Sequence, residues 1–243
     1  MNVALKKPVK CSACPIRHRA ICSRCDEDEL SLLESMKSYQ TFQAGEVILW
    51  RGEPLDFVAS IVRGVATLSK TMEDGRRQMV GLLLPSAFIG RPGRQTIDFD
   101  VTATDEVTLC CFDRVKFETL IDETPAVAQR LMELALDELD AARDWMLLLG
   151  RKTAREKIAT FIEMLSRHSN AADSAVSDQI DLHMTREQIA DYLGLTLETV
   201  SRQFTALKKD GIIDFSDRRH FVVKDMAALL DETGDDADGG VVS

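Results

Sequence analysis

The alternation of apolar and polar residues changes character several times along the chain. Near residues 26–36, an acidic start precedes three apolar residues at helical spacing, Leu30, Leu33 and Met36, which predicts a short amphipathic helix. Between residues 39 and 114, short apolar runs such as EVILW, FVASIV and VTLCCF are separated by glycines, and Asp74-Gly75 is a hairpin signal. Strands this short and this regularly spaced predict a compact all-β barrel or roll.

Residues 125–150 carry the longest helical pattern. One face is apolar at every third or fourth position, through Leu131, Ala135, Leu139, Ala142, Met146 and Leu149. At about 1.5 Å per residue this helix extends about 39 Å, which exceeds what a small domain needs for its own packing. The helix either packs against its own barrel or forms the seam of a homodimer, and its length favours the seam.

The last third of the chain predicts two helices joined by a tight turn. After a linker at Gly150, residues 151–166 have the pattern of an amphipathic helix. The residues expected to cap and end the next two helices are Thr185, Gln188, Gly194, Thr196 and Gly211. The segment IIDFSDRRHFVV then predicts a hairpin with its turn at residues 216–219. These are the parts of a winged helix-turn-helix.

The outward face of the second helix carries the candidate chemistry. Glu198 and Arg202 are four residues apart and Ser201 lies beside them, so all three project on one side. In a DNA major groove, Arg bonds guanine, Glu accepts from cytosine, and Ser reaches a base edge or a phosphate. An ordinary exposed ion pair is the alternative, but the position after a capped helix and a glycine turn favours DNA. The side chains expected at phosphates are Thr185, Arg186, Thr196, Lys208 and Arg218.

Composition limits the class of protein. The 243 residues are 45% hydrophobic, which is enough for about two domains. No stretch approaches the roughly 18 apolar residues of a membrane span, so we expect a soluble, cytoplasmic protein with no membrane contact. The formal net charge of −10 disfavours nucleic-acid binding only if it is averaged over the chain, because much of it comes from an acidic tail at 227–243 that we expect to be disordered.

Six cysteines are present, and four of them lie in the stretch CSACPIRHRAICSRC at residues 11–25. Cytoplasmic thiols stay reduced, so this grouping indicates metal or redox chemistry before disulfides. Cys11 and Cys14 can place two thiolates on one metal centre, and Cys22 can join them by closing over a flexible loop that contains Pro15. Cys25 completes a C-x2-C-x7-C-x2-C pattern, which leaves open a zinc site, although zinc ribbons usually separate their pairs by about 15 to 20 residues.

A β-roll, a long helix and a winged helix-turn-helix in this order resemble the cyclic-AMP receptor protein superfamily of transcription regulators. FQAGEVILWRGEPLDFVASIVRGVATL is similar to its β-roll. LGLTLETVSR looks like the recognition helix of its FNR branch of oxygen sensors, and CSACPIRHRAIC looks most like the FnrL type. The resemblance covers about residues 11–224. PSAFIGRPGRQTIDFDVTATDE lacks the Arg and small hydroxyl pair of the cyclic-nucleotide members, so no cyclic nucleotide is expected.

The resemblance implies a [4Fe-4S] cluster on Cys11, Cys14 and Cys22, with a fourth ligand in VTLCCF. Strand alternation places Cys110 and Cys111 on opposite faces, with Cys111 toward the core. The family's motif, a cysteine two residues before an apolar one, matches Cys110. The resemblance also implies that Glu198, Ser201 and Arg202 contact bases, that a homodimer binds palindromic double-stranded promoter DNA, and that RNA polymerase is a partner.

The sequence therefore predicts an α+β fold with an N-terminal β-roll of the cyclic-nucleotide-binding, jelly-roll type, a long dimerisation helix and a C-terminal winged helix-turn-helix. The expected segments are a cysteine-rich arm at 1–26, the β-roll at 27–122, the dimerisation helix at 123–150, the DNA-binding domain at 151–226 and the tail. A rival interpretation keeps the DNA-binding fold but places zinc in the arm and a small effector in the β-roll. A thiol redox enzyme is disfavoured, because no third group orients a cysteine with His183 or His220 and no glycine-rich phosphate loop is present.

Overall fold

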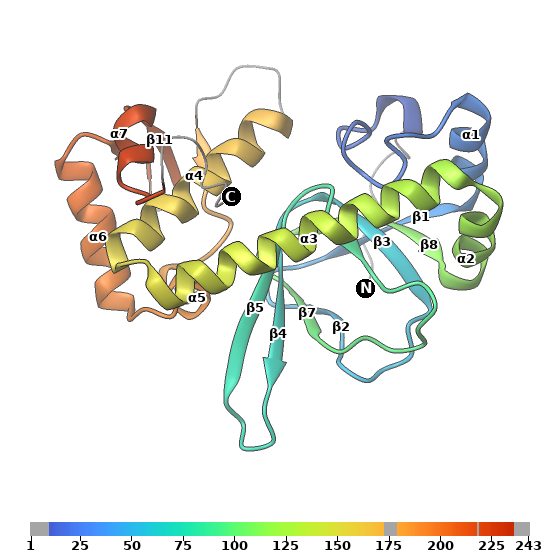
Figure 1. Cartoon of the computed structure of the whole chain (residues 1–243), viewed down its shortest axis with the longest axis horizontal. Helices are drawn as coiled ribbons and strands as arrows, with labels where there is room; N and C mark the ends of the chain where they lie inside the picture. The colour runs from blue at the N-terminus through green and yellow to red at the C-terminus, as the bar shows by residue number, and fades with distance from the viewer. Residues whose placement is uncertain (1–9, 173–178, 218, 236–243) are drawn as a thin grey trace, which may run out of the picture. The chain divides into compact units, whose positions relative to one another are not determined.

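The computed structural model describes residues 10–172, 179–217 and 219–235. The chain forms two compact units, and the boundary between them, at Ala141 and Ala142, falls inside the long helix α3 (Pro125–Arg151; Figure 1). The helix predicted over 125–150 is confirmed. In the described residues no helix combines the length and the apolar character that crossing a membrane requires.

The first unit is the predicted β-roll. Two four-stranded antiparallel sheets have the strand orders β1-β8-β3-β6 and β2-β7-β4-β5. The strands are β1 (Lys37–Phe42), β2 (Val47–Leu49), β3 (Phe57–Arg63), β4 (Ala66–Thr71), β5 (Arg77–Leu83), β6 (Phe88–Ile89), β7 (Asp100–Ala103) and β8 (Val107–Asp113). Strands β4 and β5 pair around the predicted turn, where Gly75 takes a φ of 86° that glycine adopts without strain.

Helices and the cysteine arm cover the outer face of the first sheet. The arm begins with a single 3-10 turn, η1 (Cys11–Ala13), and is followed by α1 (Glu27–Met36), where Asp26 and Glu29 form a capping box. Helix α2 (Arg114–Glu123) follows β8 directly, and Figure 1 shows α1, α2 and the first part of α3 beside β1, β3 and β8. This outer layer buries side chains against the sheet, including Leu33, Phe117, Leu120 and Val127.

The expected linker at Gly150 is wrong. Helix α3 continues through Gly150 to Arg151, and the break falls at residues 152–153. Thr153 and Glu156 form a capping pair there, since the Thr153 backbone N–H donates to Glu156 Oε2 at 2.6 Å and the Glu156 N–H donates to Thr153 Oγ1 at 3.4 Å. The T-x-x-E signal in the sequence marks the start of α4 (Ala154–Ala172), which also runs beyond the predicted residue 166.

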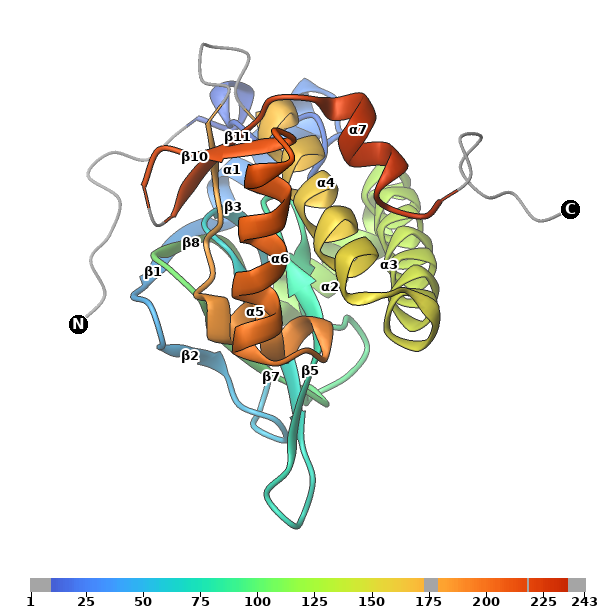
Figure 2. The same ribbon diagram turned by 90° about the vertical axis from the view of Figure 1, so that its left-hand side faces the viewer.

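The second unit is a winged helix-turn-helix. Helix α6 (Leu197–Lys209) packs against α4 and α5 (Arg186–Leu193), as Figure 2 shows. The predicted hairpin is formed by β10 (Ile213–Phe215) and β11 (His220–Val223), and a short strand that the sequence pattern did not predict, β9 (Ile180–Asp181), pairs with β11.

The tail expected to be disordered from residue 227 is ordered where the structure describes it. Leu229 of helix α7 (Met226–Asp231) is completely buried. This apolar side chain anchors a segment whose other residues include several acidic ones. Arg155 pairs with Glu232 at 2.6 Å, and Lys152 pairs with Asp235 at 2.6 Å. Residues 236–243 of the expected tail lie outside the described residues.

Candidate metal centre and recognition helix

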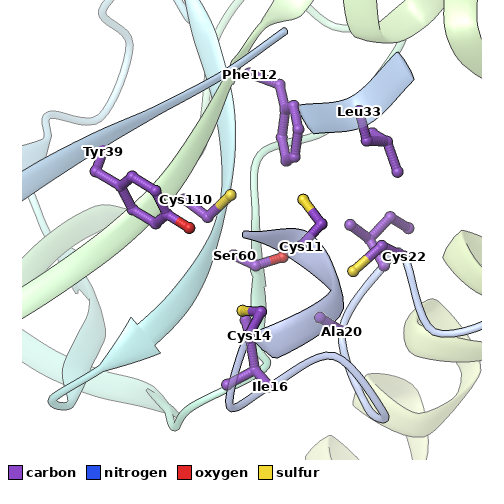
Figure 3. Close-up of a pocket in the computed structure, with 11 residues that line it drawn as sticks. Cys11, Cys14, Ile16, Ala20, Cys22, Leu33, Tyr39, Ser60, Cys110 and Phe112 are labelled. Atoms are coloured by element: carbon purple, nitrogen blue, oxygen red, sulfur yellow. The ribbon is translucent and has the colours of Figure 1, made fainter. Parts of the chain in front are cut away.

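Four cysteines from two distant segments line one small cavity. Cys11 lies on η1, Cys14 and Cys22 lie in the arm, and Cys110 lies on β8 (Figure 3). The cavity has a volume of about 20 Å³ and a mainly apolar lining that includes Leu33, Tyr39 and Phe112. These are the four cysteines that the family resemblance singled out. Cys25 and Cys111 do not line the cavity.

Strand β8 explains why Cys110 and not Cys111 faces the arm. Successive side chains of a strand point to opposite faces. Val107, Leu109 and Cys111 lie in the core between the two sheets, whereas Cys110 and Phe112 lie in the outer cluster with the arm. The predicted assignment of the two cysteines to opposite faces is therefore confirmed.

Arg17 folds the arm into a compact loop. Its Nη1 donates to the carbonyl oxygen of Cys22 at 2.6 Å, and its Nη2 donates to that of Cys25 at 2.7 Å. Ile21 and Ala20 are each 1% exposed, and Ile21 anchors the loop in the outer cluster. The sequence pattern gave no signal for this role, because an arginine in a polar segment is usually a solvated surface charge.

Cys11 is held from the other side by the end of α1 and the start of β1. Its backbone N–H donates to Glu34 Oε2 at 3.2 Å, and Lys37 Nζ donates to its sulfur at 3.3 Å. Glu34 Oε1 lies 3.8 Å from Lys37 Nζ, so one ion pair contacts both the backbone and the sulfur of Cys11.

Burial favours the protonated form of three of the cavity thiols, those of Cys14, Cys22 and Cys110. It raises the pKa of Cys14 and of Cys22, and it raises the pKa of Cys110 far above the usual thiol range. Positive charges oppose this effect, with Arg17 near Cys22 and Lys37 near Cys14. A metal centre would displace the protons on binding, because only the thiolate is a ligand.

The donor set fits an iron-sulfur cluster. Four thiols with no carboxylate among them suit a soft metal centre. As the side chains stand, no three or more His, Cys, Asp or Glu residues in the described ranges are arranged to hold a single metal ion. The cavity as it stands has room for about one water, so binding a cluster would require the four cysteine side chains to move apart.

The arm is bound to helix α3 by a charged contact. Arg24 Nη2 lies 2.7 Å from Glu133 Oε1, and Arg130 Nη1 lies 3.0 Å from Glu133 Oε2. Arg130 Nη2 also donates to the carbonyl oxygen of Arg19 at 2.7 Å. The hydrogen bonds from Arg24, and then from Arg130, hold the pKa of Glu133 below its usual range, so the carboxylate stays charged at neutral pH. The cysteine loop and α3 are thus physically connected.

The predicted seam residues of α3 differ in exposure. Leu139 and Met146 are exposed, whereas Leu131 packs against the outer cluster of its own unit and Leu149 is half-buried. Ala135 and Ala142 are exposed. The apolar strip also includes three exposed residues that were not predicted, Met132, Leu136 and Leu147, which extend the same helical spacing.

The recognition helix α6 is placed as its caps predict. Thr185 and Gln188 form the capping box of α5, Gly194 ends α5 with a φ of 62°, and the Thr196 hydroxyl accepts from the Thr199 N–H at 3.2 Å. The inward residues Val200, Phe204 and Leu207 are buried, as predicted.

All three predicted base-contacting residues of α6 are exposed: Glu198, Ser201 and Arg202. No ion pair joins Glu198 to Arg202 in the part of the chain that the structure describes. The alternative interpretation, an ordinary helix ion pair, is therefore not formed in the free protein. The two charged groups remain available to a partner.

The predicted phosphate-contacting residues have different environments. Thr185 and Thr196 use their hydroxyls as helix caps, and Lys208 pairs with Asp214 at 3.0 Å. Arg186 stacks on Phe204 at 3.5 Å and on Phe215 at 4.9 Å, measured to the ring centroids. Its buried Nη1 has no hydrogen-bond partner among the described residues, and the side chain borders an open groove of about 240 Å³. Arg218 lies outside the described residues.

Comparisons with known proteins agree with this architecture. Residues 39–124 match the cyclic nucleotide-binding domain family, and residues 156–232 match the Crp-like helix-turn-helix domain family. The chain is 60% identical to the transcriptional activator protein FnrL of Cereibacter sphaeroides over 96% of this chain and 95% of that protein. It is 31% identical to the transcriptional activator protein anr of Pseudomonas aeruginosa, over 86% of this chain and 90% of that protein. The solved structure of FixK2 from Bradyrhizobium japonicum is 34% identical, with a TM-score of 0.73 over 81% of this chain and 96% of that one.

Proposed function

Because the chain belongs to the CRP/FNR family of transcription regulators, which bind DNA and are not enzymes, we propose that it is the oxygen-responsive kind. In this proposal a homodimer carrying one [4Fe-4S] cluster per chain binds palindromic promoter DNA, and oxygen inactivates it. The observation that carries the proposal is the cavity lined by Cys11, Cys14, Cys22 and Cys110, next to an arm bound to α3.

Those four cysteines would hold the cluster. When bound, the cluster would supply iron-thiolate bonds between the arm and β8 that oxygen can break. Arg17 closes the arm loop, and Arg24 together with Arg130 binds that loop to α3. A change in the arm therefore reaches the helix that carries the proposed dimer seam.

The exposed strip of α3 supports a homodimer. Five large apolar side chains are exposed on this one helix: Met132, Leu136, Leu139, Met146 and Leu147. Exposed apolar strips of this kind mark protein–protein contacts. Two subunits joined there would present two α6 helices to half-sites about 34 Å apart, one turn of DNA. Since DNA binding then depends on two linked contacts, loss of the dimer removes most of the specific affinity.

On DNA, Glu198, Ser201 and Arg202 would contact base edges and would set the sequence preference. The proposed phosphate contacts are Thr185, Arg186, Thr196, Lys208 and Arg218. These contacts position the helix without specifying sequence. The family resemblance adds RNA polymerase as the proposed partner of the DNA-bound dimer.

Metal analysis of anaerobically purified protein tests the proposal. We expect four irons and four sulfides per chain and visible absorbance that bleaches in air. Cys110→Ser and Cys111→Ser form a matched pair, because the two residues are adjacent on β8 but lie on opposite faces. We expect Cys110→Ser to lose the iron and Cys111→Ser to retain it. One zinc per chain that is insensitive to air would refute the oxygen sensor and would favour the zinc alternative.

A further inference from the structure

Lys37 places a buried positive charge at the cysteine cavity. It is the first residue of β1, its side chain is 5% exposed, and its Nζ lies 3.3 Å from Cys11 Sγ. Burying an ammonium group is unfavourable unless it gains a partner that needs its charge. The sequence pattern did not single out this residue, because the contact joins positions 26 residues apart.

Three neighbouring groups surround the ammonium group of Lys37. Glu34 Oε1 lies 3.8 Å from Nζ, while Glu34 Oε2 accepts the backbone N–H of Cys11 at 3.2 Å. The aromatic ring of Tyr39 lies below Nζ at 5.6 Å from its centroid. Glu34 is 41% exposed and is therefore partly screened by water, whereas the cysteine side of Lys37 is buried. The ammonium group therefore lies between a partly hydrated carboxylate and the buried sulfur of Cys11.

We propose that Lys37 is a positioning residue for the iron-sulfur centre, and that its N–H contact and charge at Cys11 slow oxidation of that centre by oxygen. The inference rests on the proposed function. Hydrogen bonds to the sulfurs and the net charge nearby set how readily such a centre loses an electron. The oxidant is dioxygen, which takes up one electron and leaves as superoxide. A fixed cation beside a ligand sulfur disfavours that electron loss, because the charge that stays behind becomes more positive.

Arg17 is a second cation near the cavity, and its role differs. Its guanidinium donates to two carbonyl oxygens, those of Cys22 and Cys25, and no contact joins it to a sulfur among the described hydrogen bonds. Arg17 therefore shapes the loop, whereas Lys37 contacts a ligand sulfur directly. Because Arg17 keeps its charge when Lys37 is replaced, the effect of Lys37 is partial and measurable.

The test compares three replacements of Lys37 in anaerobically purified full-length protein. Lys37→Met removes the donor and the charge, Lys37→Gln keeps a donor without the charge, and Lys37→Arg keeps both. Lys70→Met is the control, since Lys70 is an exposed residue of β4 that lies over Phe99. The readouts are iron and sulfide content, the rate of bleaching in air-saturated buffer, and the midpoint potential.

We expect Lys37→Met to bleach about three- to tenfold faster than the native chain, with a lower midpoint potential. A tenfold change in the one-electron equilibrium corresponds to about 59 mV. Lys37→Arg should restore the native rate within about twofold, and Lys37→Gln should fall between Met and Arg. If Lys37→Met holds no iron, the bleaching rate and midpoint potential of Lys37→Gln decide instead, because this variant also lacks the charge.

Equal bleaching rates and equal potentials for native protein and Lys37→Met would overturn the role of Lys37 and leave the oxygen sensor intact. Loss of iron from both Lys37→Met and Lys37→Arg, with the melting temperature of the metal-free chain unchanged, would also overturn it. The shape of the side chain, and not its charge, would then decide whether the centre forms. A native chain that takes up no iron would overturn this inference together with the proposed function.

Discussion

Replacing Arg186 with Met separates the effect of this side chain on the stability of the free protein from its effect on the affinity for DNA. Burial lowers the pKa of Arg186 to about 10, so the group stays charged at neutral pH but is poorly solvated. Relative to its ordinary value of 12.5, and reduced for the water that still screens this partly exposed group, the shift corresponds to about 2 kcal/mol against the charged form. Stacking on Phe204 and Phe215 returns about 2 kcal/mol. The two effects nearly cancel, so the charge of Arg186 contributes little net stability to the free protein.

A methionine at this position keeps the apolar contacts with both rings and removes the poorly solvated charge. We expect Arg186→Met to melt at the native temperature or a few degrees above it, by calorimetry of the metal-free chain. On DNA the buried Nη1 would meet a phosphate. Its loss should reduce the slope of log affinity against log salt by about 0.9 per subunit. Fluorescence anisotropy with a palindromic duplex and a scrambled one, over a range of salt, measures that slope.

Lys208→Met is the matched comparison. Lys208 already pairs with Asp214 in the free protein, so its removal should change the salt slope less than removal of Arg186. The reasoning fails if Arg186→Met lowers the melting temperature by several degrees and leaves the salt slope unchanged. Arg186 would then be a structural cation between two rings.

Three further predictions concern the arm, the seam and the wing. Arg130→Met removes the bond to the Arg19 carbonyl, together with a buried Nε that has no hydrogen-bond partner among the described residues. The net loss of about 1 to 2 kcal/mol should make the metal-free arm about 5- to 30-fold more sensitive to trypsin. An unchanged cleavage rate would show that α3 does not hold the arm. Leu139→Glu should keep the native melting temperature but sediment as a monomer under anaerobic conditions, whereas a retained dimer would exclude this face of α3 as the seam. Hydrogen bonds from the Arg219 and His220 backbone N–H groups lower the pKa of Asp217 to about 2. The contribution of Asp217 to stability is therefore present above about pH 4 and is lost as the pH falls toward 2. An NMR titration midpoint near 4 for Asp217 would contradict this.

Sequence patterns predicted those parts of the site that depend on local geometry. The two faces of β8 follow from the period of a strand, so Cys110 and Cys111 were separated correctly. Thr185 and Thr196 were identified as caps because helix starts need side-chain acceptors. The same rule applied to Thr153 would have corrected the linker at Gly150.

The contacts that were missed join residues far apart in sequence. Lys37 reaches Cys11, and Arg130 reaches the Arg19 carbonyl, only because the β-roll brings the arm beside β1 and α3. Neither residue type nor spacing signals such a contact, since Lys and Arg in a helix or at a strand end are usually solvated. Likewise, Leu229 anchors a tail whose composition alone suggests disorder.

The contact between Arg24 and Glu133 also constrains the order in which the molecule is assembled. These two residues stand 109 positions apart, so the arm leaves the ribosome long before the helix that receives it. During synthesis the arm cysteines are therefore exposed to iron donors and to oxidants while Cys110 and α3 are still missing. Because contacts between distant segments form late, docking of the arm should be among the last steps of folding. The proposed response to oxygen would then become possible only after helix α3 has been made.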